Sequence, residues 1–104
     1  MKLRELKEFD AAEALDDDET IRRYLSPAFE GGDSREILRA LGTVARARGM
    51  SALARESGVA REALYRALSD SGNPEFATIV KVVSALGLRL TLTTHSNADE
   101  ALLD

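Results

Sequence analysis

One stretch near the middle of this 104-residue chain constrains its fold more than any other. Residues 54–68 read ARESGVAREALYRAL, which is two helix-forming segments joined at Gly58. Two short helices that cross steeply need a small residue at the crossing, here Ala54, and a turn residue that accepts positive φ, here Gly58. They also need inward-facing apolar residues, which are Leu53, Val59, Leu64 and Ala67. The stretch therefore predicts a helix-turn-helix hairpin over Ser51–Ser57 and Ala60–Ser69.

The same spacing leaves an outward-facing set on the second helix of the hairpin: Ala60, Arg61, Glu62, Tyr65 and Arg66. Arginine can donate two hydrogen bonds to a guanine, glutamate can accept one from a cytosine, and tyrosine can reach a phosphate or a thymine methyl group. Glu62 would repel phosphates unless it points at a base edge or pairs with Arg66 four residues later. The set favours DNA binding, and a core hairpin that carries solvated charges is the alternative.

An amphipathic helix is predicted on each side of the Gly31–Gly32 pair. The first has acids at its start, which suit the positive end of the helix dipole, and an apolar stripe of Ile21, Tyr24, Leu25 and Ala28. Pro27 predicts a kink or an early end in this helix. The second is capped by Asp33 or Ser34, ends before Gly49, and has an apolar face of Ile37, Leu38, Leu41, Val44 and Ala45.

After the hairpin, a fifth helix and one strand are predicted. The helix is capped by Asn73, has Pro74 in its first position and ends at Gly87. Its core-facing side is expected to carry Phe76, Ile79, Val80, Val83 and Leu86. From Leu88 to Thr94 leucines alternate with polar residues, which is the two-residue period of a half-buried strand.

The net charge of −4 conceals an uneven distribution. Residues 1–40 carry seven basic and eleven acidic side chains, residues 41–95 carry seven and four, and residues 96–104 carry three acids. A basic middle suits phosphates, whereas an acidic front half suits a basic protein partner. We therefore divide the chain into an acidic extension with the first helix (1–32), a DNA-binding domain with the C-terminal strand (33–94) and an acidic tail (95–104) that is expected to be mobile.

Several kinds of chemistry are not expected from this composition. The chain has no cysteine for disulfides or thiolate metal sites, and no apolar run reaches the ~20 residues of a membrane span. Helix capping explains the acids at residues 16–19 better than metal binding does, and His95 has no nucleophile or metal-ligand spacing near it. We expect a cytoplasmic protein that is not an enzyme and has no catalytic residues, metal or cofactor.

Residues 9–93 resemble the addiction-module antidote family, the Xre/HigA-type antitoxins of bacterial toxin–antitoxin pairs. The resemblance is most specific in GMSALARESGVAREALYRALS and GNPEFATIVKVVSALGL. It implies an all-α, five-helix, lambda-repressor-like domain that binds double-stranded operator DNA, represses its own operon and neutralises a small basic RelE/ParE-like toxin. A stand-alone Xre-family repressor without a toxin is the alternative.

The resemblance also assigns roles to particular residues. Ala60 would begin the recognition helix, with Arg61, Glu62, Tyr65 and Arg66 facing bases and nearby phosphates. Three further residues would lie near the DNA backbone: Ser51, Ser69 and Asn73.

Two protein contacts are expected in addition. The toxin contact is placed in the acidic front half, through Phe9, Leu15, Ile21, Tyr24 and Leu25. Tyr24 has an equally good alternative role in the core stripe of its own helix. A homodimer is expected through Leu88, Leu90 and Leu92, because an unpaired strand edge invites association. The strand pairs either with its copy in a second chain or with the edge of the toxin's sheet.

Overall fold

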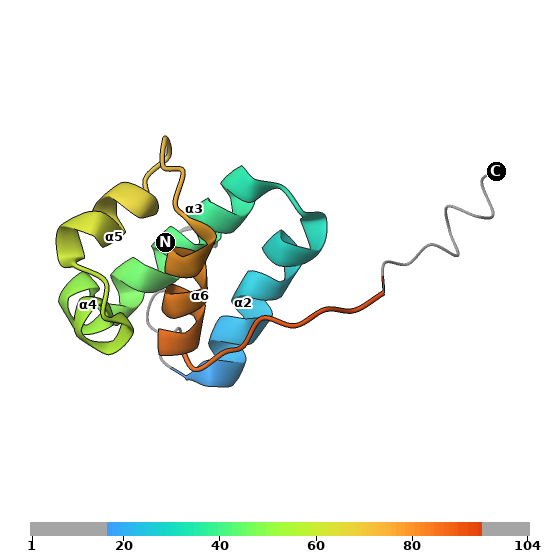
Figure 1. Cartoon of the computed structure of the whole chain (residues 1–104). Coiled ribbons are helices and arrows are strands. Elements are labelled where there is room, and N and C mark those ends of the chain that lie inside the picture. Colours follow the sequence, from blue (N-terminus) through green and yellow to red (C-terminus); the bar gives the residue numbers. More distant parts are fainter. Residues whose placement is uncertain (1–16, 95–104) are drawn as a thin grey trace, which may run out of the picture.

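The computed structural model describes residues 17–94, and helix α2 is the first element of this part. The five helices of this part are α2 (Asp18–Gly31), α3 (Ser34–Arg48), α4 (Met50–Ser57), α5 (Arg61–Ala67) and α6 (Phe76–Ala85). Figure 1 shows α4 and α5 on one side of the molecule, α2 on the other, and α3 and α6 between them. The prediction of an all-α fold with five helices is confirmed for these residues.

The core draws side chains from every one of these helices. Its most buried residues are Ile21, Leu25, Leu41, Val44, Ala45, Met50, Leu53, Leu64, Ala67, Leu68, Val82, Val83 and Leu86. Burial of large aliphatic side chains of this kind contributes about 1.5–3 kcal/mol each. The predicted inward faces of α3 and of the hairpin are confirmed, with Ile37, Leu38 and Val59 packed at the edge of the core. Helix α2 belongs to the same core as the helices that follow it.

Helix α2 begins with a well-formed cap and passes through its proline. The Asp17 carboxylate accepts hydrogen bonds from the Thr20 N–H at 2.8 Å and the Thr20 hydroxyl at 3.0 Å. These bonds hold the pKa of Asp17 below its ordinary value. The early end predicted at Pro27 is wrong, because the helix continues to Gly31. Leu25 and Phe29 both pack on the core, so packing holds the helix on either side of the proline.

Helix α6 differs from its prediction in both start and buried face. It begins at Phe76, two residues after the expected Pro74, and Glu75 precedes it without a side-chain cap bond. Phe76 is 74% exposed, because the first turn extends beyond the core, and Val80 is 40% exposed. The buried stripe runs through Val82, Val83 and Leu86. Hydrophobic periodicity identified the helix but placed Phe76 and Val80 in the core wrongly.

The predicted strand over Leu88–Thr94 is not formed within the single chain. No strand occurs anywhere in residues 17–94, so this segment has no ladder partner there. Figure 1 shows the segment leading away from the helices after α6. Leu88 packs at the edge of the core, whereas Leu90 is 37% exposed and Leu92 is 96% exposed. Pairing with another chain stays a prediction.

Some predictions fall outside the described residues. These concern Phe9 and Leu15, the acidic arm before residue 17, His95 and the tail at 95–104. Between residues 17 and 94, no helix combines the length and the apolar character needed to cross a membrane. Within the same range, acidic and histidine side chains do not gather in groups of three that could hold a metal ion.

Candidate nucleic-acid interface

Gly58 forms the sharp turn between α4 and α5. Its φ is +78°, a left-handed conformation that costs other residues about 1–2 kcal/mol. Its N–H closes α4 by donating to the Ala54 carbonyl at 3.0 Å, and the Ser57 hydroxyl accepts from the Val59 N–H at 3.1 Å. Leu53 and Leu64 are fully buried on either side of the turn. Two helices joined by a sharp turn are therefore present as predicted, and the second spans Arg61–Ala67, shorter at both ends than the predicted Ala60–Ser69.

Helix α5 carries the predicted outward-facing set on its exposed surface. The side chains of Ala60, Arg61, Glu62, Tyr65 and Arg66 are all exposed, while Leu64 and Ala67 are buried beneath them. Tyr65 is half exposed, so its ring is accessible to a ligand. The helix therefore holds an aromatic and two cationic side chains toward solvent on a rigid, core-anchored support.

Two local relationships organise the charges on α5. The Arg61 guanidinium lies over the Tyr65 ring, 5.5 Å from its centroid, a cation–π contact across one helical turn. At an exposed position such a contact contributes about 0.5–1 kcal/mol. Among the ion pairs of the described residues, none joins Glu62 to Arg66. The Glu62 carboxylate is therefore available to accept a hydrogen bond from a base edge.

The three residues expected near the DNA backbone occupy different environments. Ser51 is exposed in the first turn of α4, and Asn73 is exposed between α5 and α6. Asn73, Arg66 and Glu75 line one shallow cavity of about 250 Å³. The Ser69 hydroxyl is already used, since it donates to the Arg66 carbonyl at 2.9 Å. Ser51, Arg66 and Asn73 thus offer free polar groups, whereas Ser69 caps the end of α5.

Three residues that support the hairpin were missed in the sequence. The Arg35 guanidinium donates to the Asp70 carbonyl at 2.8 Å, which ties α3 to the loop after α5. Arg48 lies 3.6 Å from the Glu56 carboxylate and donates to the Ala85 carbonyl at 3.3 Å, which joins α4 to the end of α6. Gly72 packs directly on the backbone of α5. The two bonds to backbone carbonyls join residues 35 and 37 apart, so no local sequence pattern indicates them.

The residues expected to contact a toxin divide between the core and the surface. Ile21 and Leu25 are 0% and 3% exposed, so in this structure they stabilise the fold and cannot touch a partner. Tyr24 is 38% exposed and lines an open groove of about 380 Å³ between α2 and α3. Of the described members of the expected toxin-binding set, Tyr24 alone has its side chain available.

Comparison with known proteins connects this arrangement to a family. A family model described as probable addiction module antidote protein matches residues 5–94. The chain belongs to this family. The chain is also 51% identical, over 85 residues, to an uncharacterized protein of Haemophilus influenzae (strain ATCC 51907 / DSM 11121 / KW20 / Rd), a match that covers 82% of this chain and 88% of the relative. No solved structure is significantly similar to the antidote protein. The resemblance to antidotes is thereby confirmed, while the Xre/HigA subtype stays a prediction.

Proposed function

We propose that this antidote protein is an antitoxin that neutralises a RelE/ParE-like toxin and binds operator DNA to repress its own operon. Membership of the antidote family supports the antitoxin role. One observation carries the DNA-binding role: α5 is anchored by Leu64 and Ala67 and presents an exposed aromatic and cationic face. We propose that the helices form a lambda-repressor-like domain of the Xre/HigA type, acting in the cytoplasm.

In this proposal α5 enters the major groove of the operator. Arg66 would donate to a guanine or a phosphate, and the Arg61–Tyr65 pair would contact the adjacent base or backbone. Ala60 is small enough for close approach and can touch a thymine methyl group. Glu62 would read a cytosine amino group, because it has no ion pair with Arg66. Ser51 and Asn73 would hold phosphates on either side and fix the register.

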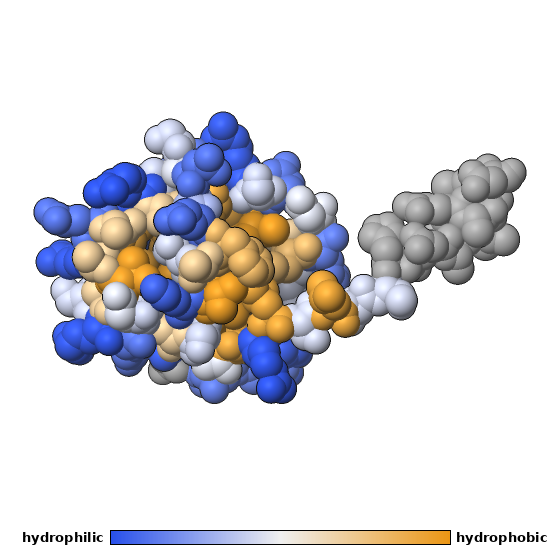
Figure 2. Space-filling view, in the orientation of Figure 1, coloured by the Kyte–Doolittle hydropathy of each residue, from blue (hydrophilic) through white to orange (hydrophobic). Residues whose placement is uncertain are grey.

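Two copies of the chain would bind one operator. Figure 2 shows apolar surface over the face that contains α6, with a further apolar area on the segment that leaves it. The exposed apolar residues of this region are Phe76, Val80, Leu90 and Leu92. Residues 76–94 include two cations, Lys81 and Arg89, and no acid, so a basic toxin suits this surface less well than a second copy does. A twofold dimer would present its recognition helices to half-sites about 10 bp apart.

The test of this function uses the chain's own promoter and the neighbouring reading frame. The full-length protein should retard a promoter fragment in a mobility-shift assay, with affinity that falls as salt concentration rises. Co-expression with the adjacent gene should rescue growth that the adjacent gene alone arrests. DNA binding without any growth-arresting neighbour would instead identify a stand-alone Xre-family repressor. Loss of both activities in the folded protein would overturn the proposal.

A further inference from the structure

An open groove lies between α2 and α3, away from the recognition helix. We call it the α2–α3 groove, and its lining residues are Tyr24, Pro27, Ala28, Gly31, Asp33, Glu36, Arg39 and Ala40. Its volume is about 380 Å³. Figure 1 shows α2 and its connection to α3 on the opposite side of the molecule from α4 and α5. A partner seated in this groove would therefore leave the DNA-facing surface of α5 free.

The apolar part of the groove combines small residues with one aromatic ring. Ala28, Gly31 and Ala40 project little, so a long side chain can lie along the groove. Tyr24 lines the same groove and is 38% exposed, although its position in the helix had suggested a core role. An accessible tyrosine ring offers a flat face for a planar cation and a hydroxyl for water or a polar group.

Carboxylates dominate the charge around this groove. Asp33 and Glu36 line it. One guanidinium is present, that of Arg39, which pairs with Glu36 at 3.4 Å through exposed side chains. Such exposed pairs are weak, so a second cation can compete for the carboxylate. The lining of the groove therefore contains two acids and one base.

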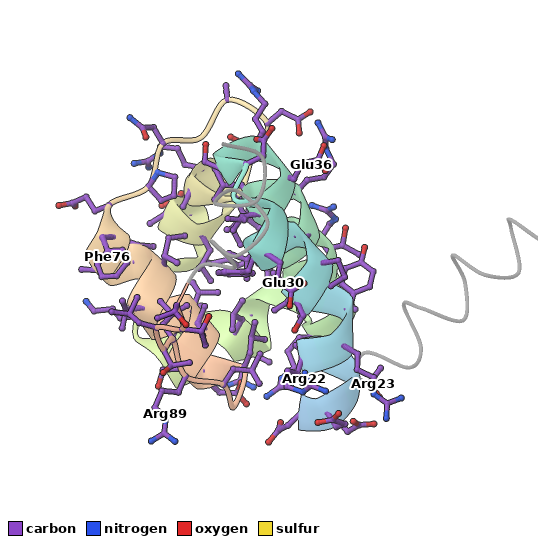
Figure 3. The ribbon with its side chains drawn as sticks, turned by 90° about the vertical axis from the view of Figure 1, so that its right-hand side faces the viewer. Arg22, Arg23, Glu30, Glu36, Phe76 and Arg89 are labelled. Carbon is purple, nitrogen blue, oxygen red and sulfur yellow. The ribbon has the colours of Figure 1, made fainter. Side chains whose placement is uncertain are left out.

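The other nearby cations are engaged elsewhere. Arg35 extends to the Asp70 carbonyl at 2.8 Å. Arg22 and Arg23 both bond Glu19, at 2.6 Å and 3.3 Å, near the start of α2. Figure 3 shows Arg22 and Arg23 at one end of α2, with Glu30 and Glu36 displaced toward the other. Arg22 and Arg23 are thus paired with Glu19, and the Arg35 guanidinium, although it keeps its charge, is directed to the loop after α5.

We infer that the α2–α3 groove receives an arginine side chain from the toxin. The guanidinium would lie against the Tyr24 ring and its N–H groups would bond Glu36, with its methylenes along Ala28 and Ala40. This inference rests on the proposed antitoxin function, and it names where a basic toxin is held. DNA does not suit this groove, because its carboxylates repel phosphates. Toxin and operator can then bind the same chain together.

The experiment compares alanine substitutions at the two exposed tyrosines of the full-length protein. Tyr24→Ala should raise the Kd for the purified product of the adjacent gene by about tenfold, as expected for an aromatic contact at a binding site, and leave operator affinity unchanged. Tyr65→Ala is the matched control, and should weaken operator binding while toxin affinity stays the same. Tyr24→Phe keeps the ring and should restore most of the toxin affinity. Calorimetry measures the affinity for the toxin, and a mobility-shift assay measures the affinity for the operator.

A charge variant provides a second, independent readout. Glu36→Lys reverses one carboxylate of the groove at an exposed position in the first turn of α3, so circular dichroism should first establish that the helix is kept. Toxin binding should then fall by about tenfold or more. Unchanged toxin affinity in both Tyr24→Ala and Glu36→Lys would overturn the inference and leave the antitoxin function standing. A changed oligomeric state in these variants would assign the groove to a second copy and overturn it too. If the wild-type chain does not bind the adjacent product, both proposals fail.

Discussion

Gly72 lies against the Ala67 carbonyl so closely that a Cβ on residue 72 would stand 2.4 Å from its oxygen. The Arg66 carbonyl oxygen would be 2.7 Å away. Both oxygens belong to backbone at the end of α5, which cannot move aside as a side chain can. The loop after α5 is thus packed directly on that helix, and only a residue without a Cβ fits there.

Gly72→Ala should therefore destabilise the fold at the end of α5. Forcing a methyl group into a packed site costs about 1–3 kcal/mol, and here the displaced atoms are backbone. We expect a lower urea midpoint with an unchanged slope, and weaker operator binding because Arg66 shifts with its backbone. Gly31→Ala is the control, since nothing lies within 4 Å of the added Cβ. Equal stability of the two variants would show that the loop yields easily.

Arg66→Ala should weaken operator binding by on the order of 1–3 kcal/mol if the guanidinium reads a base. If it holds a phosphate, all DNA sequences should be weakened alike and the salt dependence should become shallower. A mobility-shift comparison of operator with scrambled DNA separates these cases. Arg23→Ala is the control, because that exposed arginine lies on α2. Full operator affinity in the triple variant Arg61→Ala, Tyr65→Ala, Arg66→Ala would make the hairpin a core element only.

The lowered pKa of Glu19 predicts a measurable dependence of stability on pH at the start of α2. Hydrogen bonds from Arg22, with support from Arg23, lower its pKa from 4.5 to about 2. Because the folded state binds the proton less readily than the unfolded chain does, this stabilisation is present above pH 4.5 and disappears as the pH falls toward 2. The side chain is exposed, so the effect is small. NMR titration should give Glu19 a carboxyl pKa well below that of an ordinary glutamate, and Glu19→Gln should reduce the loss of stability between these pH values.

The parts of the fold that could be predicted are those governed by short-range rules. Asp33 caps α3 by accepting the Arg35 N–H at 2.8 Å, and Gly58 supplies the left-handed turn, as the local residue types indicated. Periodicity correctly separated Leu64 and Ala67 from the exposed Tyr65 and Arg66. In each case the residue that determines the local structure lies within a few residues of it in the sequence.

The errors arose where the outcome depends on distant residues. Phe76 shares the helical face of Val83, yet it is exposed because the core does not extend to the first turn of α6. Likewise, Ile21 and Leu25 were assigned to a partner, but the other helices bury them. The Arg48 bond to the Ala85 carbonyl joins residues 37 apart and follows from tertiary packing alone. The α2–α3 groove also depends on tertiary packing, because it forms only where α2 and α3 pack together.

The proposed dimer contact combines α6 with the segment after it, and each part can be tested by substitution. Leu90→Pro removes a ladder N–H and fixes φ, so it should shift sedimentation from dimer to monomer if Leu88–Thr94 pairs with its copy. Phe76→Glu tests whether the exposed face of α6 joins that contact. Its matched control is Ser84→Glu, which adds the same charge at another exposed position of α6. If Phe76→Glu dissociates the dimer and Ser84→Glu does not, α6 is part of the contact. A Leu90→Pro protein that stays dimeric at all concentrations would place the dimer contact outside the segment.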